Sequence, residues 1–210
     1  MLATVITCPR RWEHYRRCLR NFAALDFGFP LQTFQTAEAN DRPRVNNNLN
    51  ARAALAYAYA YLPDGGWLLY LEDDVVLSPR LPAMLPLLVE LGGSQNVDCW
   101  NLCNRKNLVE RRCEMRGLVV NELAYLVNGA NGLLIPKHHL ARMLAAHWPD
   151  ISDLAKFSPI HHPGWKMWQV VRRAGRTRRR CLDVRRIRPA AIHGSEPCNL
   201  TKSSSARPPK

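Results

Sequence analysis

An apolar run that ends in three acids constrains the fold of this chain more than any other feature of its sequence. Residues 67–71 read Trp-Leu-Leu-Tyr-Leu, and Glu72, Asp73 and Asp74 follow without a break. A strand that is apolar throughout is typical of a sheet covered by helices on both faces. Adjacent carboxylates at its end repel one another and lose hydration, which raises their pKa values unless a cation neutralises them. The run therefore predicts an α/β fold with a charged ligand at the carboxyl edge of the sheet.

Strand and helix patterns alternate along the rest of the chain. Apolar and β-branched runs predict strands at 2–7, 31–35, 67–71, 97–102, 121–127 and 132–135, with short extended pieces at 181–184 and 190–193. Helical spacing predicts helices at 12–24, 46–62, 81–91, 136–147 and 165–174. This alternation predicts one α/β domain, residues 1–198, with a mostly parallel sheet flanked by helices. Residues 199–210, rich in Ser, Lys, Pro and Arg, are predicted to be a disordered basic tail.

The balance of charge points to an anionic partner. Thirty Lys and Arg residues face 17 acids, which gives a net charge of +13. A field of this sign attracts anions, so nucleotide-sugars, nucleic acids and anionic polysaccharides or lipids are all compatible partners. Charge alone does not rank them.

The cysteines and the hydropathy pattern bear on location. Seven cysteines, an odd number without a C-x-x-C pair, fit reduced thiols in a cytoplasm better than a disulfide framework. No apolar run approaches the roughly 20 residues of a membrane helix. The sequence therefore predicts a cytoplasmic protein without a membrane span, in the host cytoplasm if a phage encodes it.

The acids at the end of the apolar run suit a hard cation. Mg²⁺ and Mn²⁺ take carboxylate oxygens together with phosphate oxygens. The strand's period of two places Glu72 and Asp74 on one side and Asp73 on the other. The alternative is a solvated acidic turn that caps the next helix.

Four segments, taken in order, carry a family resemblance. Residues 68–75, Leu-Leu-Tyr-Leu-Glu-Asp-Asp-Val, resemble the D-x-D motif of GT-A fold glycosyltransferases in its Glu-Asp-Asp form. Residues 4–11 are similar to the family's first strand and nucleotide-binding loop, 50–55 to the helix before the D-x-D strand, and 191–195 to the closing strand. The resemblance covers most of residues 1–195. It implies a single GT-A-like (Rossmann-like) domain and a metal-dependent enzyme that moves a sugar from a nucleotide-sugar, such as a UDP-sugar, to an acceptor hydroxyl.

The same resemblance implies roles for individual residues. Asp74 would ligate Mn²⁺ or Mg²⁺ directly, and Glu72 would contact the ribose or reach the metal through water. His193 would complete the metal site or touch the diphosphate, although a satisfied histidine at a strand end is the alternative. The donor would be bound by these residues: Thr7, Cys8, Arg10, Arg11, Asn50, Arg52, Glu72 and Asp73.

The general base is harder to place. In inverting members of the family a carboxylate near the start of a late helix removes the acceptor proton, but residues 158–165 contain no acid. Asp153 lies just upstream, and His161 or His162 could serve instead. Inversion or retention of the anomeric configuration stays open. The Asn-Gly-Ala-Asn-Gly turn at 128–132 resembles the family's acceptor or donor-sugar loop, with an ordinary hairpin turn as the alternative.

An arginine-rich segment suggests the acceptor. Nine arginines lie between residues 172 and 188, with only Asp183 as an acid among them. Trp165 and Trp168 precede the segment, so aromatic surface and positive charge are expected to lie together, as a polyanion requires. One hypothesis is therefore that the acceptor is DNA with hydroxymethylated bases, as for phage DNA glycosyltransferases. A surface glycan such as lipopolysaccharide is the competing acceptor, and a merely solvated charged face is the simplest interpretation.

Two other classes of function remain open. A non-catalytic nucleic-acid-binding protein would need the acids only for structure. A metal-dependent nucleotidyltransferase would also hold Mg²⁺ at the end of a sheet, but the sequence lacks a second pair of catalytic carboxylates at fitting spacing. The sugar, the nucleotide and the oligomeric state are not determined by the sequence.

Overall fold

The structure is a computed structural model that describes residues 1–35, 43–102, 109–123, 131–146, 166–173 and 185–186. The helices are α1 (Trp12–Ala23), α2 (Pro43–Tyr61), α3 (Leu81–Gln95) and α4 (Lys137–Ala145), and a 3-10 turn, η1 (Pro9–Arg11), precedes α1. The strands are β1 (Leu2–Ile6), β2 (Leu31–Phe34), β3 (Trp67–Glu72), β4 (Val75–Val76), β5 (Cys99–Asn101), β6 (Val109–Met115), β7 (Leu118–Leu123), β8 (Gly132–Pro136), β9 (Met167–Arg173) and β10 (Arg185–Arg186). No helix in these ranges is long and apolar enough to cross a membrane.

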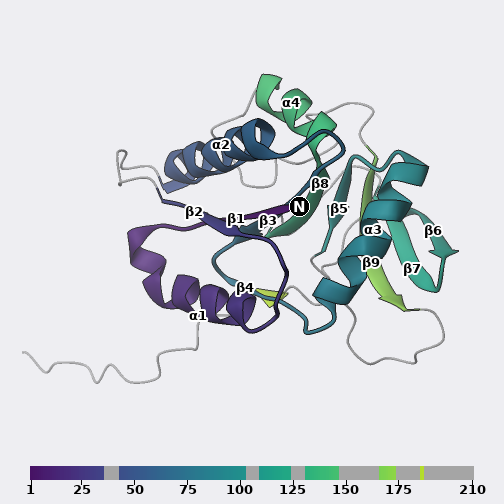
Figure 1. Cartoon of the computed structure of the whole chain (residues 1–210), viewed down its shortest axis with the longest axis horizontal. Coiled ribbons are helices and arrows are strands. Elements are labelled where there is room, and N and C mark those ends of the chain that lie inside the picture. Colours follow the sequence, from purple (N-terminus) through teal and green to yellow (C-terminus); the bar gives the residue numbers. More distant parts are fainter. Residues whose placement is uncertain (36–42, 103–108, 124–130, 147–165, 174–184, 187–210) are drawn as a thin grey trace, which may run out of the picture.

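A single large sheet organises the molecule, in the order β2-β1-β3-β8-β5-β9-β7-β6 (Figure 1). The pairing directions show that β2, β1, β3, β5, β9 and β6 run one way, while β8 and β7 run against them. A separate two-stranded sheet pairs β4 with β10. The predicted α/β class with a mostly parallel, helix-flanked sheet is therefore confirmed. The carboxyl ends of β1 and β3, which are parallel neighbours, lie at one edge.

The sheet is covered on both faces, as the apolar run in β3 predicts. Leu69 and Leu71 face a core shared with α1 and α3, whereas Leu68 and Tyr70 face a second core shared with α2 and α4. Figure 1 shows α2 and α4 together on one side of the sheet. Strand alternation thus divides one apolar stretch between two cores, and each fully buried leucine side chain contributes about 1.5–3 kcal/mol of transfer free energy.

The helix predicted at 165–174 is wrong. Residues 167–173 instead form β9, which pairs with β5 in parallel and with β7 in antiparallel orientation. Met167 packs in the second core and Trp168 in the first, with the ring centroid of Trp168 5.7 Å from that of Trp100. Consecutive residues that are buried on opposite faces need the period of a strand, so the tertiary context overrides the helical spacing.

Burial of Trp168 also changes the argument about the acceptor. The side chain of Trp168 is 2% exposed, so it offers no aromatic surface beside the arginine-rich segment. Trp165 and most of that segment lie outside the described residues. The expectation that Trp168 and the positive charge form one binding surface is therefore wrong, because the indole is needed to fill the core.

The sequence did not predict β6 or the hairpin that it forms with β7, although the strand predicted at 121–127 overlaps the end of β7. Arg116 and Gly117 form its turn, both with positive φ angles, and the largely exposed β6 is the edge of the sheet. Arg111 on β6 forms an ion pair of 2.8 Å with Glu122 on β7. Residues 109–115 are rich in charged residues and lack the apolar pattern that predicts a strand, because an edge strand needs few apolar residues.

Two adjacent glycines in α3 provide a test of how tightly the first core is packed. A Cβ atom on Gly92 would enter the space of the Trp67 ring and lie 2.9 Å from Nε1 of Trp100, whereas one on Gly93 would meet nothing within 4 Å. We expect Gly92→Ala to lower the free energy of unfolding by about 1–3 kcal/mol through overpacking. Gly93→Ala is expected to raise it by about 0.5–1 kcal/mol, because alanine loses less backbone entropy in a helix. Urea unfolding of both variants checks this, and equal effects would contradict the packing described here.

Candidate functional site

The acids at the end of β3 lie in a turn rather than in the strand. β3 ends at Glu72, and Asp73 and Asp74 form the turn that leads into β4. Both aspartates are 2% exposed. Nη2 of Arg11 lies 2.8 Å from Oδ1 of Asp73 and 3.0 Å from Oδ2 of Asp74. The prediction that Asp73 and Asp74 point to opposite sides is therefore wrong, because the chain leaves the extended conformation after Glu72.

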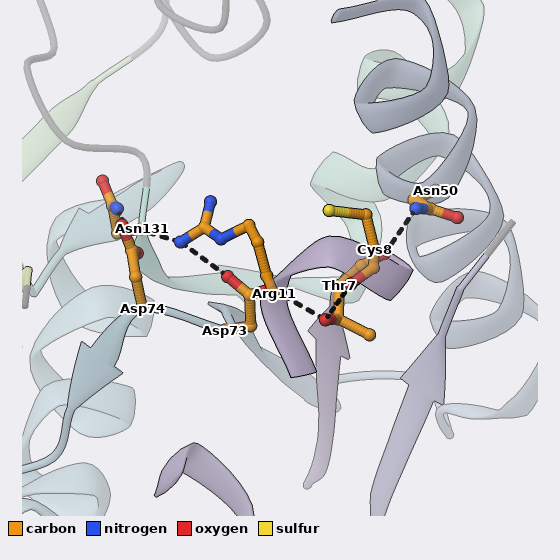
Figure 2. A network of polar contacts seen from close by, with 7 residues as sticks. All are labelled: Thr7, Cys8, Arg11, Asn50, Asp73, Asp74 and Asn131. Atoms are coloured by element: carbon orange, nitrogen blue, oxygen red, sulfur yellow. Dashed lines mark hydrogen bonds and ion pairs between the residues drawn. The ribbon is translucent and has the colours of Figure 1, made fainter. Parts of the chain in front are cut away.

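Arg11 reaches the two aspartates from the loop that follows the neighbouring strand. Ile6 of β1 pairs with Glu72 of β3, so the segment after β1 emerges beside the acids. Cys8 and the turn η1 then reverse the chain, with the backbone N–H of Arg11 donating to the carbonyl of Cys8 at 2.9 Å. Figure 2 shows the guanidinium directed towards Asp73 and Asp74. The predicted nucleotide-binding loop and the acidic motif are thus parts of one site.

Thr7 and Asn50 fix the start of this loop. The Thr7 hydroxyl donates a hydrogen bond of 2.7 Å to Oδ2 of Asp73. Nδ2 of Asn50, on α2, donates to the Thr7 carbonyl at 2.9 Å. Thr7 and Asn50 are both buried, so each bond is shielded from competing water (Figure 2). Residues 50–55, which the sequence placed at the site, therefore contribute through Asn50 by holding the loop.

Asn131 holds the other side of the acidic turn. Its Nδ2 donates to Oδ1 of Asp74 at 2.7 Å, and its carbonyl accepts the backbone N–H of Glu72 at 2.8 Å. The sequence singled out Asn131 only as part of a glycine-containing turn, not as a partner of the acids. Its position just before β8, which pairs with β3, brings it there. Residues 128–130 of that turn lie outside the described residues, and Gly132 is the first residue of β8.

The electrostatics of the site follow from burial of the acids, which is opposed mainly by the positive charge of Arg11. Burial raises the pKa of Asp73, and the Arg11 charge and the Thr7 hydrogen bond offset only part of this effect. Burial disfavours the charged form of Arg11, but the carboxylates of Asp73 and Asp74 outweigh it and raise the pKa of Arg11. Cys18, behind the acids on α1, has its pKa raised to about 12 by burial and by the same two carboxylates. Its thiol is therefore protonated at neutral pH and is no nucleophile.

The acidic turn offers carboxylate oxygens, which are the ligand atoms that a hard cation prefers. Each oxygen of Asp73 and Asp74 has a partner among Arg11, Thr7 and Asn131. A carboxylate oxygen has two lone pairs and is a ligand that Mg²⁺ and Mn²⁺ prefer, so Asp74 is of the right chemical type to hold either ion. Among the described residues, Glu72, Asp73 and Asp74 do not form a group of three with converging ligand atoms. Within the ranges that the structure describes, Arg11 is the cation that forms ion pairs with Asp73 and Asp74.

The remaining predicted site residues divide into two groups. Arg10 is exposed on η1, and Arg52 donates a hydrogen bond of 3.3 Å to the carbonyl of Leu144 in α4. Four residues lie outside the described ranges, namely Asp153, His161, His162 and His193. Their predicted roles as general base or metal ligand stay predictions.

Two solved structures are distantly similar to this chain. No family model matches the chain, and no well-characterised protein matches its sequence. A crystal structure of a glycosyltransferase involved in the glycosylation of the major capsid of PBCV-1 is similar at 12% identity and a TM-score of 0.42, over 68% of this chain and 63% of that one. S. aureus TarS, residues 1–349, is similar at 12% identity and a TM-score of 0.44, over 83% of this chain and 59% of that one. The chain thus spans about three fifths of either structure, and its function must be argued from the site.

Proposed function

We propose that this chain is a GT-A type glycosyltransferase, which transfers a sugar from a nucleotide-sugar donor to an acceptor hydroxyl. One observation carries the proposal: Arg11 joins two buried aspartates at the carboxyl edge of the sheet, beside the loop after β1. Open α/β sheets bind their ligands at this edge. A buried carboxylate with a raised pKa, such as Asp73, is costly to stability, which favours a functional reason for keeping it.

The donor would lie over the β1–η1 loop. Thr7 and Asn50 fix this loop through hydrogen bonds to Asp73 and to the backbone, so the donor meets a surface that is already ordered. Arg11 is 35% exposed and is therefore accessible to a ligand from solvent while it contacts the acids. A guanidinium forms strong charge-assisted hydrogen bonds with phosphate oxygens. We infer that Arg11 binds the diphosphate, together with the exposed Arg10.

In the reaction, the bond between the anomeric carbon and the diphosphate oxygen breaks, and a bond to the acceptor oxygen forms. The leaving diphosphate gains negative charge, which Arg11 stabilises from a fixed position. The acceptor hydroxyl loses its proton to a base, for which Asp153, His161 and His162 are the candidates from the sequence.

A divalent cation is part of the proposal. Asp74 would hold it directly, Glu72 would contact it or the ribose, and His193 would complete the site. When bound, Mg²⁺ or Mn²⁺ supplies Lewis-acid stabilisation of the leaving diphosphate. Asn131 orients the Asp74 carboxylate by donating to Oδ1. Such support from a neighbouring side chain is typical of metal ligands.

The acceptor remains a prediction from charge. The net charge of +13 favours an anionic acceptor, and both hydroxymethylated DNA and a surface glycan fit it. The two are separated by incubating the protein and donor with hydroxymethylated duplex DNA or with lipopolysaccharide and following transfer of a labelled sugar. Transfer to DNA should fall steeply with salt, because phosphate contacts release counterions. No DNA binding at low salt would exclude the DNA acceptor.

Donor binding should be visible as thermal stabilisation. A nucleotide-sugar at 100 times its Kd adds about 2.7 kcal/mol to the free energy of unfolding. For a chain of this size the melting temperature should rise by about 5–10 °C. The screen compares UDP-, GDP-, CDP- and dTDP-sugars with and without Mn²⁺, and the matching nucleosides, which lack the diphosphate, are the control. If no donor shifts the melting temperature, the proposed function is wrong.

A further inference from the structure

A second cluster of polar side chains lies at the other end of the central strands, beside the start of β3 and away from the acidic turn. Asp98 immediately precedes β5, and His138 and His139 lie in the first turn of α4, which directly follows β8. In the register of β3 and β8, Pro136 pairs with Trp67, the first residue of β3. Glu72, by contrast, is the last residue of β3. The length of β3 therefore separates this cluster from the acidic turn, and the proposed donor site does not account for it.

The three side chains converge. Ligand atoms of Asp98, His138 and His139 all lie within 4.8 Å of one another, and no other such group occurs in the described part of the chain. Nδ1 of His139 is 3.0 Å from Oδ1 of Asp98. Ligand atoms on a tetrahedral zinc ion, bonded at about 2.0–2.1 Å, are roughly 3.3 Å apart. The cluster is thus close to the spacing that a shared ion requires.

The carboxylate of Asp98 is held in a fixed orientation by its neighbours. The backbone N–H of Lys166 donates to its Oδ2 at 2.6 Å, which directs Oδ1 towards His139. Burial alone would raise the pKa of Asp98, but the His139 imidazole and the Lys166 amide hold it below its usual value.

The two histidines differ in exposure, as expected for a metal site with one coordination position open to solvent. The His139 side chain is fully buried, whereas His138 is exposed. Metal can enter from the side of His138, and water can complete the coordination there. Two imidazoles and one carboxylate are a donor set that zinc takes with a fourth ligand from solvent.

We propose that Asp98, His138 and His139 form a zinc site that joins the start of β5 to the start of α4. The ion links two segments that are distant in sequence, and it stabilises the folded chain because the unfolded chain lacks the site. The proposal is independent of glycosyl transfer.

The test uses the full chain after removal of metal with a chelator. Zn²⁺ is titrated by calorimetry and by thermal shift, and Co²⁺ is used to report tetrahedral coordination through its visible absorption. We expect one zinc ion per chain at this site and a higher melting temperature in its presence. His138→Ala should weaken zinc affinity at least about 100-fold, since even loss of an outer-shell partner costs 10–100-fold. His138 is exposed, so the variant should fold, and circular dichroism with a parallel His138→Gln variant checks this.

Matched controls identify the site. His14→Ala, at the other end of β3 near Asp73, should leave zinc affinity unchanged. Arg142→Ala should tighten zinc binding, because the exposed Arg142 acts electrostatically on the Asp98 carboxylate and repels a cation there. The proposal is overturned if the wild-type chain binds no zinc, or if both His138 variants keep the wild-type affinity.

Discussion

Asp74→Asn is expected to reduce sugar transfer by about 10²- to 10³-fold, the loss typical of removing one preorganised electrostatic contact from an active site. Asp74 is buried and close to Arg11, and it is the residue proposed to hold the divalent cation. The substitution removes one negative charge and keeps the shape of the side chain. The amide oxygen can still accept the hydrogen bond from Asn131, so the turn should keep its conformation.

The measurement is the initial rate of sugar transfer, or of donor hydrolysis if the acceptor is unknown, with the melting temperature recorded alongside. Asp64→Asn is the matched control. It makes the same chemical change at an exposed carboxylate that pairs with Lys137, beside the start of β3 rather than its end. Its activity should equal that of the wild type. An Asp74→Asn variant that keeps more than about a tenth of the wild-type rate would show that this carboxylate is structural only.

Arg11→Gln is expected to cost about 3 kcal/mol of folding free energy at neutral pH. This is the lower end of the range for breaking a buried ion pair, chosen because Arg11 is partly exposed while Asp73 and Asp74 are not. The loss should depend on pH. Without the guanidinium, the pKa of Asp73, which burial already raises, rises further in the folded chain.

The sign of the pH dependence follows from proton linkage. Below the unfolded-state pKa of 3.8, Asp73 carries its proton in both states, so the difference between variant and wild type is small. Above that pH the unfolded chain releases the proton and the folded variant holds it, so the variant loses stability as pH rises. Urea unfolding at several pH values from about 4 to 8 measures this. A gap between variant and wild type that is constant over this range would contradict the ion-pair assignment.

A double-mutant cycle separates charge pairing from packing. On an Asp73→Asn background, Arg11→Gln should cost clearly less, because one of the two carboxylates that Arg11 neutralises is gone. Arg16→Gln is the control for removal of an arginine. Arg16 is exposed and lies 3.9 Å from Glu13, a geometry that contributes at most about 1 kcal/mol.

The local sequence pattern was sufficient to predict β3 and its end at the acids. Residues 67–71 are apolar without interruption, so only a strand covered on both faces buries them all. Local pattern was insufficient to predict β9. Residues 167–173 match a helix in spacing, but Met167 and Trp168 fill opposite cores because β5 and β7 offer them a place between two strands. The strands that pair with such a segment decide whether it is a helix or a strand, and its own sequence does not identify them.

The sequence by itself determined the α/β class, the edge of the sheet at which a ligand is expected, and the segments after β1 and β3 that meet there. These follow from local periodicity and from the rule that parallel strands end at a common edge. Only the tertiary structure decided that Asp73 and Asp74 share Arg11, that Asn131 holds Asp74, and that Asp98 meets His139. Each of these contacts joins residues that are far apart in sequence. Their geometry depends on how turns end and how strands register, and no pattern of a few residues encodes it.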